Sequence, residues 1–248
     1  MTDHPMIFNA AMVQALLAGR KTQHRVPITR LRIRKRFTKV TEFGPSTTKG
    51  YDWHFRDRRA CWNDLRDAEM RAALPCAIGD RLSVRELWRA SFWSPQDIDA
   101  SARTWEDTPK CERTKDLVSD KWFGADSHLS DAWDRPTSWL SPVYMPRWAS
   151  RLTLIVTDVR VQRVQEISAD DAVAEGINHT MLDCYGPACP SDPEWSCNLH
   201  GCCGRREVFR DLWDATHAKR PEHQWKANPW VCALTFDVMR ANIDEGAA

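Results

Sequence analysis

The sequence predicts an α+β fold: a small β-barrel with flanking short helices and two long insertions. Short runs of alternating apolar and polar residues recur along the chain, separated by short helical patterns. Two stretches between them, residues 35–77 and 91–144, lack a clear period and are interpreted as insertions. The alternation changes phase near Thr157 and Asp158, which predicts a bulge or bend of the kind that suits small closed barrels.

The composition restricts both the fold and the function. A chain of 248 residues is long enough for one large domain with insertions, and we predict a single domain over residues 1–248. A net charge of +1 argues against a protein that coats nucleic acid by bulk electrostatics. No apolar run approaches the ~18 residues that span a bilayer, and the first residues do not resemble a signal peptide. We therefore expect a cytoplasmic protein without a membrane partner.

A short strand at residues 6–8 and a helix form the start of the chain. Asn9 is a good N-cap for this helix, and the apolar residues at 12, 13, 16 and 17 share one helical face. Gly19 stands where a left-handed C-cap is expected. The segment that follows, residues 20–25, is rich in basic residues. Such a cluster suits a nucleobase or phosphate and, with a carboxylate nearby, proton transfer.

The later strands are predicted at residues 30–36, 81–86, 151–161 and 229–236. The first of these alternates cationic and apolar residues, which indicates either a strand with one cationic face or a solvated surface ribbon. In the third, Leu152, Leu154 and Val156 share one face before the change of phase.

Two further helices are predicted between the last strands. Ser168 can cap the first of them, which is short and stops at Gly176. Glu175 is thus at the C-terminal end of a helix, where a carboxylate opposes the helix dipole. This position hints at a purpose besides local stability. The second helix places four apolar residues on one face: Val208, Phe209, Leu212 and Trp213.

Cysteines crowd into the loop at residues 184–203, which holds five of the nine in the chain. Disulfides are rare in a reducing cytoplasm, whereas pairs of thiolates with four residues between them suit tetrahedral zinc ligation. The sequence predicts a structural zinc site, with free thiols as the alternative. The predicted ligands are Cys184, Cys189, Cys197 and Cys202, with His200 or Cys203 as substitutes.

Several of these segments together resemble the ASCH domain, a small β-barrel of the PUA-like superfamily, in the form found in phages and prophages. The resemblance covers roughly half of the chain and leaves out both insertions and the cysteine-rich loop. The segments that carry it are Leu-Ala-Gly-Arg-Lys-Thr at 17–22, Gly-Asp-Arg-Leu at 79–82, residues 145–151, Glu-Gly at 175–176, residues 209–213 and residues 225–231.

The resemblance implies an activity as well as a fold. A small bacterial ASCH protein is an N4-acetylcytidine amidohydrolase, which removes the acyl group from the exocyclic amine of cytosine without a cofactor. Its essential residues are a lysine, a threonine three positions later and a glutamate on the following helix. Lys21 and Glu175 match the lysine and the glutamate, whereas His24 holds the position of the threonine and Thr22 lies nearby.

These four residues are therefore the candidate catalytic residues, and each also has a simpler interpretation. Without the resemblance, Lys21 is a surface cation and Glu175 a surface carboxylate. His24 is a candidate base, because an imidazole has an ordinary pKa of about 6.5. Alternatively, the histidine has removed catalysis and left a binding pocket.

The predicted substrate-binding residues are Arg20 and Arg25 in the basic cluster, and Arg147 and Trp148 as a pocket wall. A guanidinium suits phosphate or base edges, and an indole can stack on a base. The alternative for Trp148 is a position in the core of the barrel. The sequence predicts an amidohydrolase acting on an N4-acylated nucleoside or base. The alternatives are a non-catalytic module that binds RNA, single-stranded DNA or a modified base in the same pocket, and a nuclease.

Overall fold

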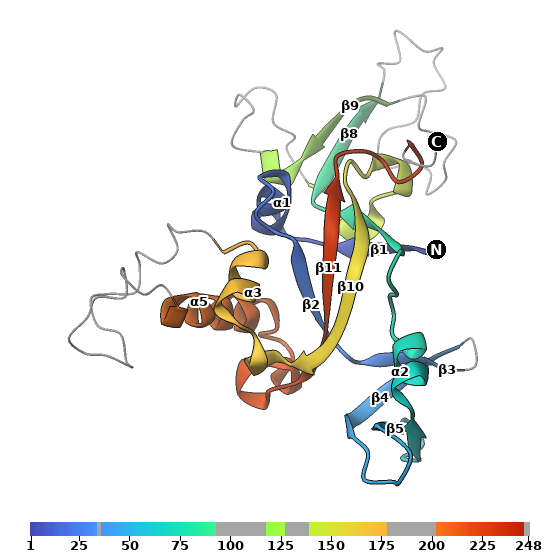
Figure 1. The fold of residues 1–248 in the computed structure, drawn as a ribbon. Helices are drawn as coiled ribbons and strands as arrows, with labels where there is room; N and C mark the ends of the chain where they lie inside the picture. Colours follow the sequence, from blue (N-terminus) through green and yellow to red (C-terminus); the bar gives the residue numbers. More distant parts are fainter. Residues whose placement is uncertain (34–35, 93–117, 127–138, 178–201, 246–248) are drawn as a thin grey trace, which may run out of the picture. The chain divides into compact units, whose positions relative to one another are not determined.

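The structure, a computed structural model, describes residues 1–33, 36–92, 118–126, 139–177 and 202–245 and has a mixed α+β fold (Figure 1). The chain divides into two compact units. The first comprises residues 1–19, 80–155 and 237–248, and the second comprises residues 20–79 and 156–236. Within the described ranges, no helix combines the length and the apolar character that a membrane crossing requires.

The largest sheet has the strand order β1-β7-β10-β11-β2. Its two long strands, β10 (Thr153–Arg163) and β11 (Trp230–Met239), contribute residues to both units. In the described part of the chain, the pairing starts at β1 and ends at β2, and no ladder joins these two strands. The α+β class is therefore confirmed, while the closed barrel stays a prediction.

The first unit begins with β1 (Asp3–Ile7), which pairs in parallel with β7 (Arg81–Arg85). Helix α1 (Ala10–Leu17) follows β1 and begins as predicted, because the side chain of Asn9 accepts a hydrogen bond of 2.9 Å from the backbone N–H of Met12. Gly19 has a φ of +69°, the left-handed conformation that ends a helix. These local predictions are confirmed.

The rest of the first unit is a hairpin and three short 3₁₀ segments around a small tryptophan core. Strands β8 (Trp88–Phe92) and β9 (Val118–Phe123) pair antiparallel. The buried cluster contains Trp88, Met145, Trp148 and Ala149. The 3₁₀ segments are η3 (Gly124–Asp126), η4 (Pro142–Tyr144) and η5 (Arg147–Ala149).

In the second unit, β2 (Gln23–Pro27) pairs antiparallel with β11, with His24 opposite Leu234. The 3₁₀ segment η6 (Val164–Glu166) leads into the short helix α3 (Ala169–Ala174). The Ser168 side chain caps this helix through a hydrogen bond of 3.0 Å from the backbone N–H of Asp171, as the sequence predicts. Glu175 is the C-cap residue.

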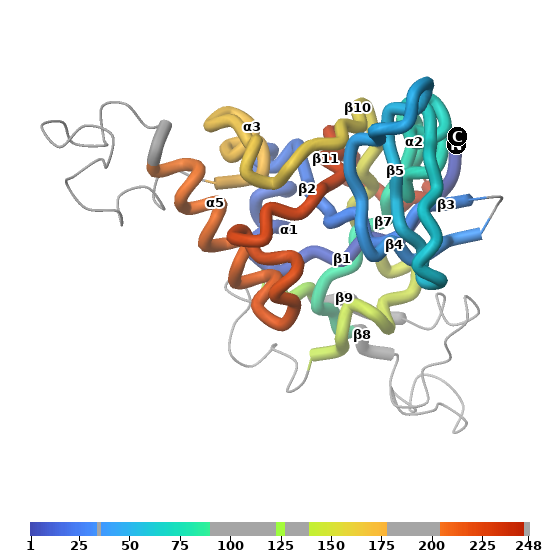
Figure 2. Tube along the Cα trace, turned by 90° about the horizontal axis from the view of Figure 1, so that it is seen from below, coloured from blue at the N-terminus to red at the C-terminus, as the bar shows by residue number. Residues whose placement is uncertain are grey.

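Helix α5 (Cys202–Thr216) lies beside α3, as both views show (Figures 1 and 2). Val208, Phe209 and Trp213 are buried on its inner face, as predicted, but Leu212 is 43% exposed. Of the four residues that the sequence places on one helical face, Leu212 is thus the one that is not buried. Two 3₁₀ segments, η7 (Pro221–His223) and η8 (Trp225–Ala227), connect α5 to β11.

Residues 35–77, which the sequence leaves without a clear period, contain three of the four strands of a regular sheet in the second unit. Its strands are β3 (Arg30–Ile33), β4 (Arg36–Pro45), β5 (Trp53–Asp57) and β6 (Trp62–Leu65), paired antiparallel in that order. Helix α2 (Asp67–Ala73) packs beside the sheet (Figure 2). The alternation is weak because β5 buries one residue, Phe55, and β4 is irregular between Val40 and Glu42.

Strand β10 shows the predicted change of phase. Leu154 and Val156 are buried and stand two residues apart. Thr157 is then exposed, and Val159 is the next buried residue. An interval of three residues reverses the face that points to the core.

Candidate functional site

The strongest candidate site lies in the second unit, where Lys21 meets Glu175. The Lys21 amine donates hydrogen bonds to Glu175 Oε2 at 2.6 Å and to the backbone oxygen of the same residue at 2.9 Å. The side chains of Lys21 and Glu175 are 0% and 6% exposed. The two groups that the sequence argument requires to converge are therefore in direct contact.

Backbone pairing positions this contact. Lys21 forms an antiparallel bridge with Glu175. The backbone N–H of Thr22 donates to the carbonyl of Ala174 at 2.8 Å, and the carbonyl of Thr22 accepts from the N–H of Phe236 at 3.0 Å. The chain just before β2 is thus held between the end of α3 and β11, which fixes Lys21 opposite the C-cap of α3.

Arg25 is a second cation on the same carboxylate. Its guanidinium donates to Glu175 Oε1 at 3.0 Å and to Asp171 Oδ2 at 2.9 Å, with a side chain that is 0% exposed. Arg160 adds a contact of 3.1 Å to the other oxygen of Asp171. The guanidinium of Arg25 is therefore occupied by two carboxylates, and its predicted role in substrate binding stays a prediction.

These cations control the charge of Glu175. Burial alone raises the pKa of a carboxyl group, but Lys21, His24 and Arg25 oppose it and hold the pKa of Glu175 well below its ordinary range. Glu175 is consequently a carboxylate at neutral pH. It cannot act there as a proton donor.

His24 is more accessible than Lys21, Arg25 and Glu175. Its side chain is 16% exposed, and its Nδ1 lies 3.8 Å from Glu175 Oε2, an electrostatic contact longer than a hydrogen bond. Burial lowers the pKa of His24, the carboxylate of Glu175 raises it, and Lys21 lowers it, with a net decrease. The imidazole is therefore neutral at neutral pH, which is the state required of a general base.

Thr22 and Arg20 flank the cluster on the exposed side. Thr22 is exposed, and the exposed guanidinium of Arg20 donates to the carbonyl of Gly176 at 3.0 Å. Both residues lie beside the buried ion pair, because they are the neighbours of Lys21 in the sequence. Their contact with a substrate stays a prediction.

The two residues predicted to form a pocket wall belong to the first unit. Arg147 pairs with Asp3 at 2.6 Å and with Asp244 at 2.7 Å. Trp148 is 6% exposed and packs edge-on against Trp88 with ring centroids 6.0 Å apart. Trp148 thus has the core position that the sequence left open as its alternative.

Three of the four predicted zinc ligands, Cys184, Cys189 and Cys197, lie outside the described residues. Of Cys202, the structure describes the backbone, as the first residue of α5. Among the described residues, no group of three or more His, Cys, Asp and Glu side chains is arranged to hold a metal ion. The structural zinc site therefore stays a prediction.

Asp171 and Arg160 are members of the cluster that the sequence argument missed as functional residues. Asp171 and Glu175 are four residues apart, a spacing that places both carboxylates on one face of the helix. From that spacing, the sequence could have predicted that both carboxylates contact the cations of residues 20–25. The chain position of Arg160, on a strand with several polar residues, gives no comparable signal.

No protein-family model, curated protein or solved structure matches this chain. The likeness to the ASCH domain therefore rests on the sequence motifs. The function must be argued from the side chains of the Lys21–Glu175 cluster and their chemistry.

Proposed function

We propose that this protein is an amidohydrolase that removes the acyl group from the N4 amine of a modified cytosine or cytidine, on an ASCH-type barrel. The observation that carries the proposal is the buried ion pair of 2.6 Å between Lys21 and Glu175, with the imidazole of His24 beside the same carboxylate. The ion pair matches the two family positions, and the imidazole supplies a base where the family has a threonine.

In the proposed reaction, neutral His24 accepts a proton from a water molecule, and the resulting hydroxide adds to the acyl carbon. The bond between that carbon and N4 then breaks. The imidazolium returns its proton to the departing amine, so the products are the free carboxylic acid and the unmodified cytosine amine. In this proposal, the hydroxyl of the exposed Thr22 donates a hydrogen bond to the carbonyl oxygen as negative charge develops on it.

Lys21 and Arg25 act as positioning residues in this proposal, because their side chains are fully buried. They keep Glu175 ionised. Glu175 in turn faces Nδ1 of His24, and in this proposal the other ring nitrogen takes the proton from the water molecule. Replacing Lys21 by methionine should therefore impair turnover through the orientation of His24.

The activity test is incubation of the purified protein with N4-acetylcytidine, with cytidine quantified by chromatography. Removal of a general base usually lowers the rate by about 10²–10⁴-fold, and we expect that loss for His24→Asn. The matched control is His54→Asn, which makes the same change on β5 of the same unit, outside the cluster. The control should keep the wild-type rate.

Two results would contradict the hydrolase. One is the absence of cytidine formation by folded wild-type protein, which would leave the binding-module alternative for the same cluster. The other is a wild-type rate in the His24→Asn variant, which would remove the proposed base.

The pH dependence provides a separate test of the same residue. Because the cluster lowers the pKa of His24, the neutral base is already formed below the ordinary imidazole range. The rate should rise with pH through a single ionisation below about 6.5 and then stay level. A rate that still rises in proportion to hydroxide above pH 8 would indicate that another group, or hydroxide itself, is the base.

A further inference from the structure

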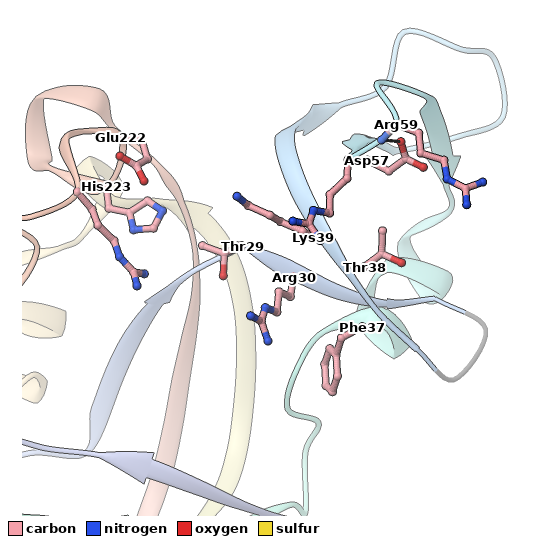
Figure 3. A pocket seen from close by; sticks show the side chains of 11 residues that line it. Thr29, Arg30, Phe37, Thr38, Lys39, Asp57, Arg59, Glu222 and His223 are labelled. Carbon is pink, nitrogen blue, oxygen red and sulfur yellow. Dashed lines mark hydrogen bonds between the residues drawn. The ribbon is translucent and has the colours of Figure 1, made fainter. Parts of the chain in front are cut away.

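A second basic site lies in the second unit, in a cavity of about 930 Å³ formed by β3, β4, the β5–β6 turn and the segment around η7 (Figure 3). None of the residues that line it belongs to the Lys21–Glu175 cluster. Five cationic side chains face two carboxylates around the cavity. The cations are Arg30, Lys39, Arg58, Arg59 and Arg220, and the carboxylates are Asp57 and Glu222.

The cations of this cavity are not neutralised by the protein. Within the described residues, none of the five side chains forms an ion pair or a hydrogen bond. The carboxylate of Asp57 stabilises the β5–β6 turn, because it accepts hydrogen bonds of 2.8 and 3.0 Å from the backbone N–H groups of Arg59 and Cys61. Burial lowers the pKa of His223 in the cavity wall, so this residue adds no positive charge at neutral pH.

The β-sheet register concentrates the charge further. Arg30 and Lys39 are direct partners across the antiparallel β3–β4 ladder. Like charges at such paired positions repel each other and disfavour the pairing. In Figure 3 both side chains lie near Thr29, on the side of it that is away from Glu222 and His223. An anion bound in the cavity would relieve this repulsion.

We propose that this cavity binds consecutive phosphates of a single-stranded nucleic acid. A guanidinium pairs well with phosphate oxygens, and four of the five cations are arginines. The cavity volume exceeds what one phosphate fills, and its cations come from separate chain segments, which suits a chain of phosphates. Phe37 also lines the cavity and is 51% exposed. The guanidinium of Arg32 lies 5.2 Å from the centre of its ring, and in this proposal the ring also stacks on an unpaired base.

The proposal is independent of the deacylase, because the assay measures binding without turnover. The probe is a fluorescently labelled single strand of about 10 nucleotides, in the range of known site sizes. Its affinity is measured by anisotropy at several salt concentrations. A strand held by about four phosphates should lose about 50-fold in affinity between about 50 and 200 mM salt.

Charge reversal distinguishes specific binding in the cavity from general attraction. Arg30→Glu and Lys39→Glu should each weaken binding and reduce the slope of log affinity against log salt by about 0.7. Each change also converts a repulsive cross-strand pair into an attractive one, so the melting temperature should not fall. Lys49→Glu makes the same charge change at an exposed position of the same unit outside the cavity, and should bind like wild type.

Two competition arms identify the source of the phosphate. Unlabelled oligonucleotide should displace the probe, whereas a nucleoside triphosphate or inorganic phosphate at the same phosphate concentration should not. Displacement by either small anion would overturn the assignment to a polynucleotide. Absence of binding, or equal weakening by Lys49→Glu, would overturn the site.

Discussion

Replacing Glu175 by glutamine is expected to lower the free energy of unfolding by about 3–5 kcal/mol, the usual cost of leaving a buried charge without its partner. The substitution keeps the volume of the side chain but removes the counter-charge of Lys21 and Arg25, both fully buried. Arg25 keeps Asp171, whereas Lys21 keeps only a backbone oxygen. Urea unfolding followed by tryptophan fluorescence measures the effect.

The matched control is Asp170→Asn, which neutralises a carboxylate on the same helix. The side chain of Asp170 is 98% exposed and its nearest cation, Arg205, is 3.8 Å away. Exposed ion pairs contribute little to stability, so this variant should unfold at the wild-type urea concentration. Equal destabilisation by the two variants would show that helix α3 is sensitive to any loss of charge. It would contradict the prediction that the burial of the Lys21–Glu175 pair causes the effect.

A double-mutant cycle separates the pair from its surroundings. Lys21→Met alone leaves Glu175 with Arg25 as its remaining buried cation, whereas Lys21→Met combined with Glu175→Gln removes both members of the pair. The double variant should be less destabilised than the sum of the two single variants. Additive losses would mean that the contact of 2.6 Å contributes no coupling energy.

The pH dependence of this stability follows from the lowered pKa of Glu175. A carboxyl group with a lowered pKa in the folded state stabilises the protein above its unfolded pKa of about 4.3. That contribution is lost as the pH falls through this value toward the folded pKa. The difference in stability between wild type and Glu175→Gln should therefore shrink in acid.

The local parts of this fold were readable from the sequence because their determinants lie within a few residues. The Asn9 and Ser168 caps and the left-handed Gly19 each depend on a neighbour no more than four residues away, and all three are confirmed. Residues 35–77 were not readable in the same way. Strands β4 and β5 form because they pair with each other. Along either strand, buried and exposed residues do not alternate regularly.

The candidate site was predictable in part. The resemblance to the ASCH domain pairs Lys21 with Glu175 across 154 residues of sequence, and the two side chains are in contact. The assignment of Arg25 to a carboxylate partner required the structure, because Asp171 lies 146 residues away and no local pattern links the two. Burial also decides what each residue can do. Lys21 and Arg25 are fully buried, whereas the side chain of His24 is 16% exposed and Thr22 is exposed.

Replacing Arg151 by methionine in the first unit is expected to have the second-largest effect on stability, again about 3–5 kcal/mol. Arg151 donates two hydrogen bonds, of 2.9 and 3.1 Å, to the carboxylate of Glu86, which is 1% exposed. It also pairs with Asp126 and lies over the ring of Phe123. Methionine keeps the apolar packing and leaves Glu86 as a buried, unpaired charge. Thermal unfolding measures the loss.

The control is Arg147→Met, the same change at an arginine of the same unit that also contacts two carboxylates. Arg147 is 38% exposed, and solvent screening limits such pairs to about 0–1 kcal/mol. Adding Glu86→Gln to the Arg151→Met variant should recover part of the lost stability, because the buried charge is then gone. Failure of this rescue would assign the loss to packing on Phe123.

The direction of the pH effect distinguishes a buried charge from lost packing. Burial raises the pKa of Glu86, and the hydrogen bonds from Arg151 oppose the increase, so removing Arg151 raises the pKa further. Between the unfolded pKa of about 4.3 and the raised folded pKa, the folded state binds more protons than the unfolded state, and stability falls as pH rises. The deficit of Arg151→Met relative to wild type should therefore be full at high pH and shrink as the pH approaches about 4.3. A deficit that is constant across this range would contradict the ionised buried Glu86.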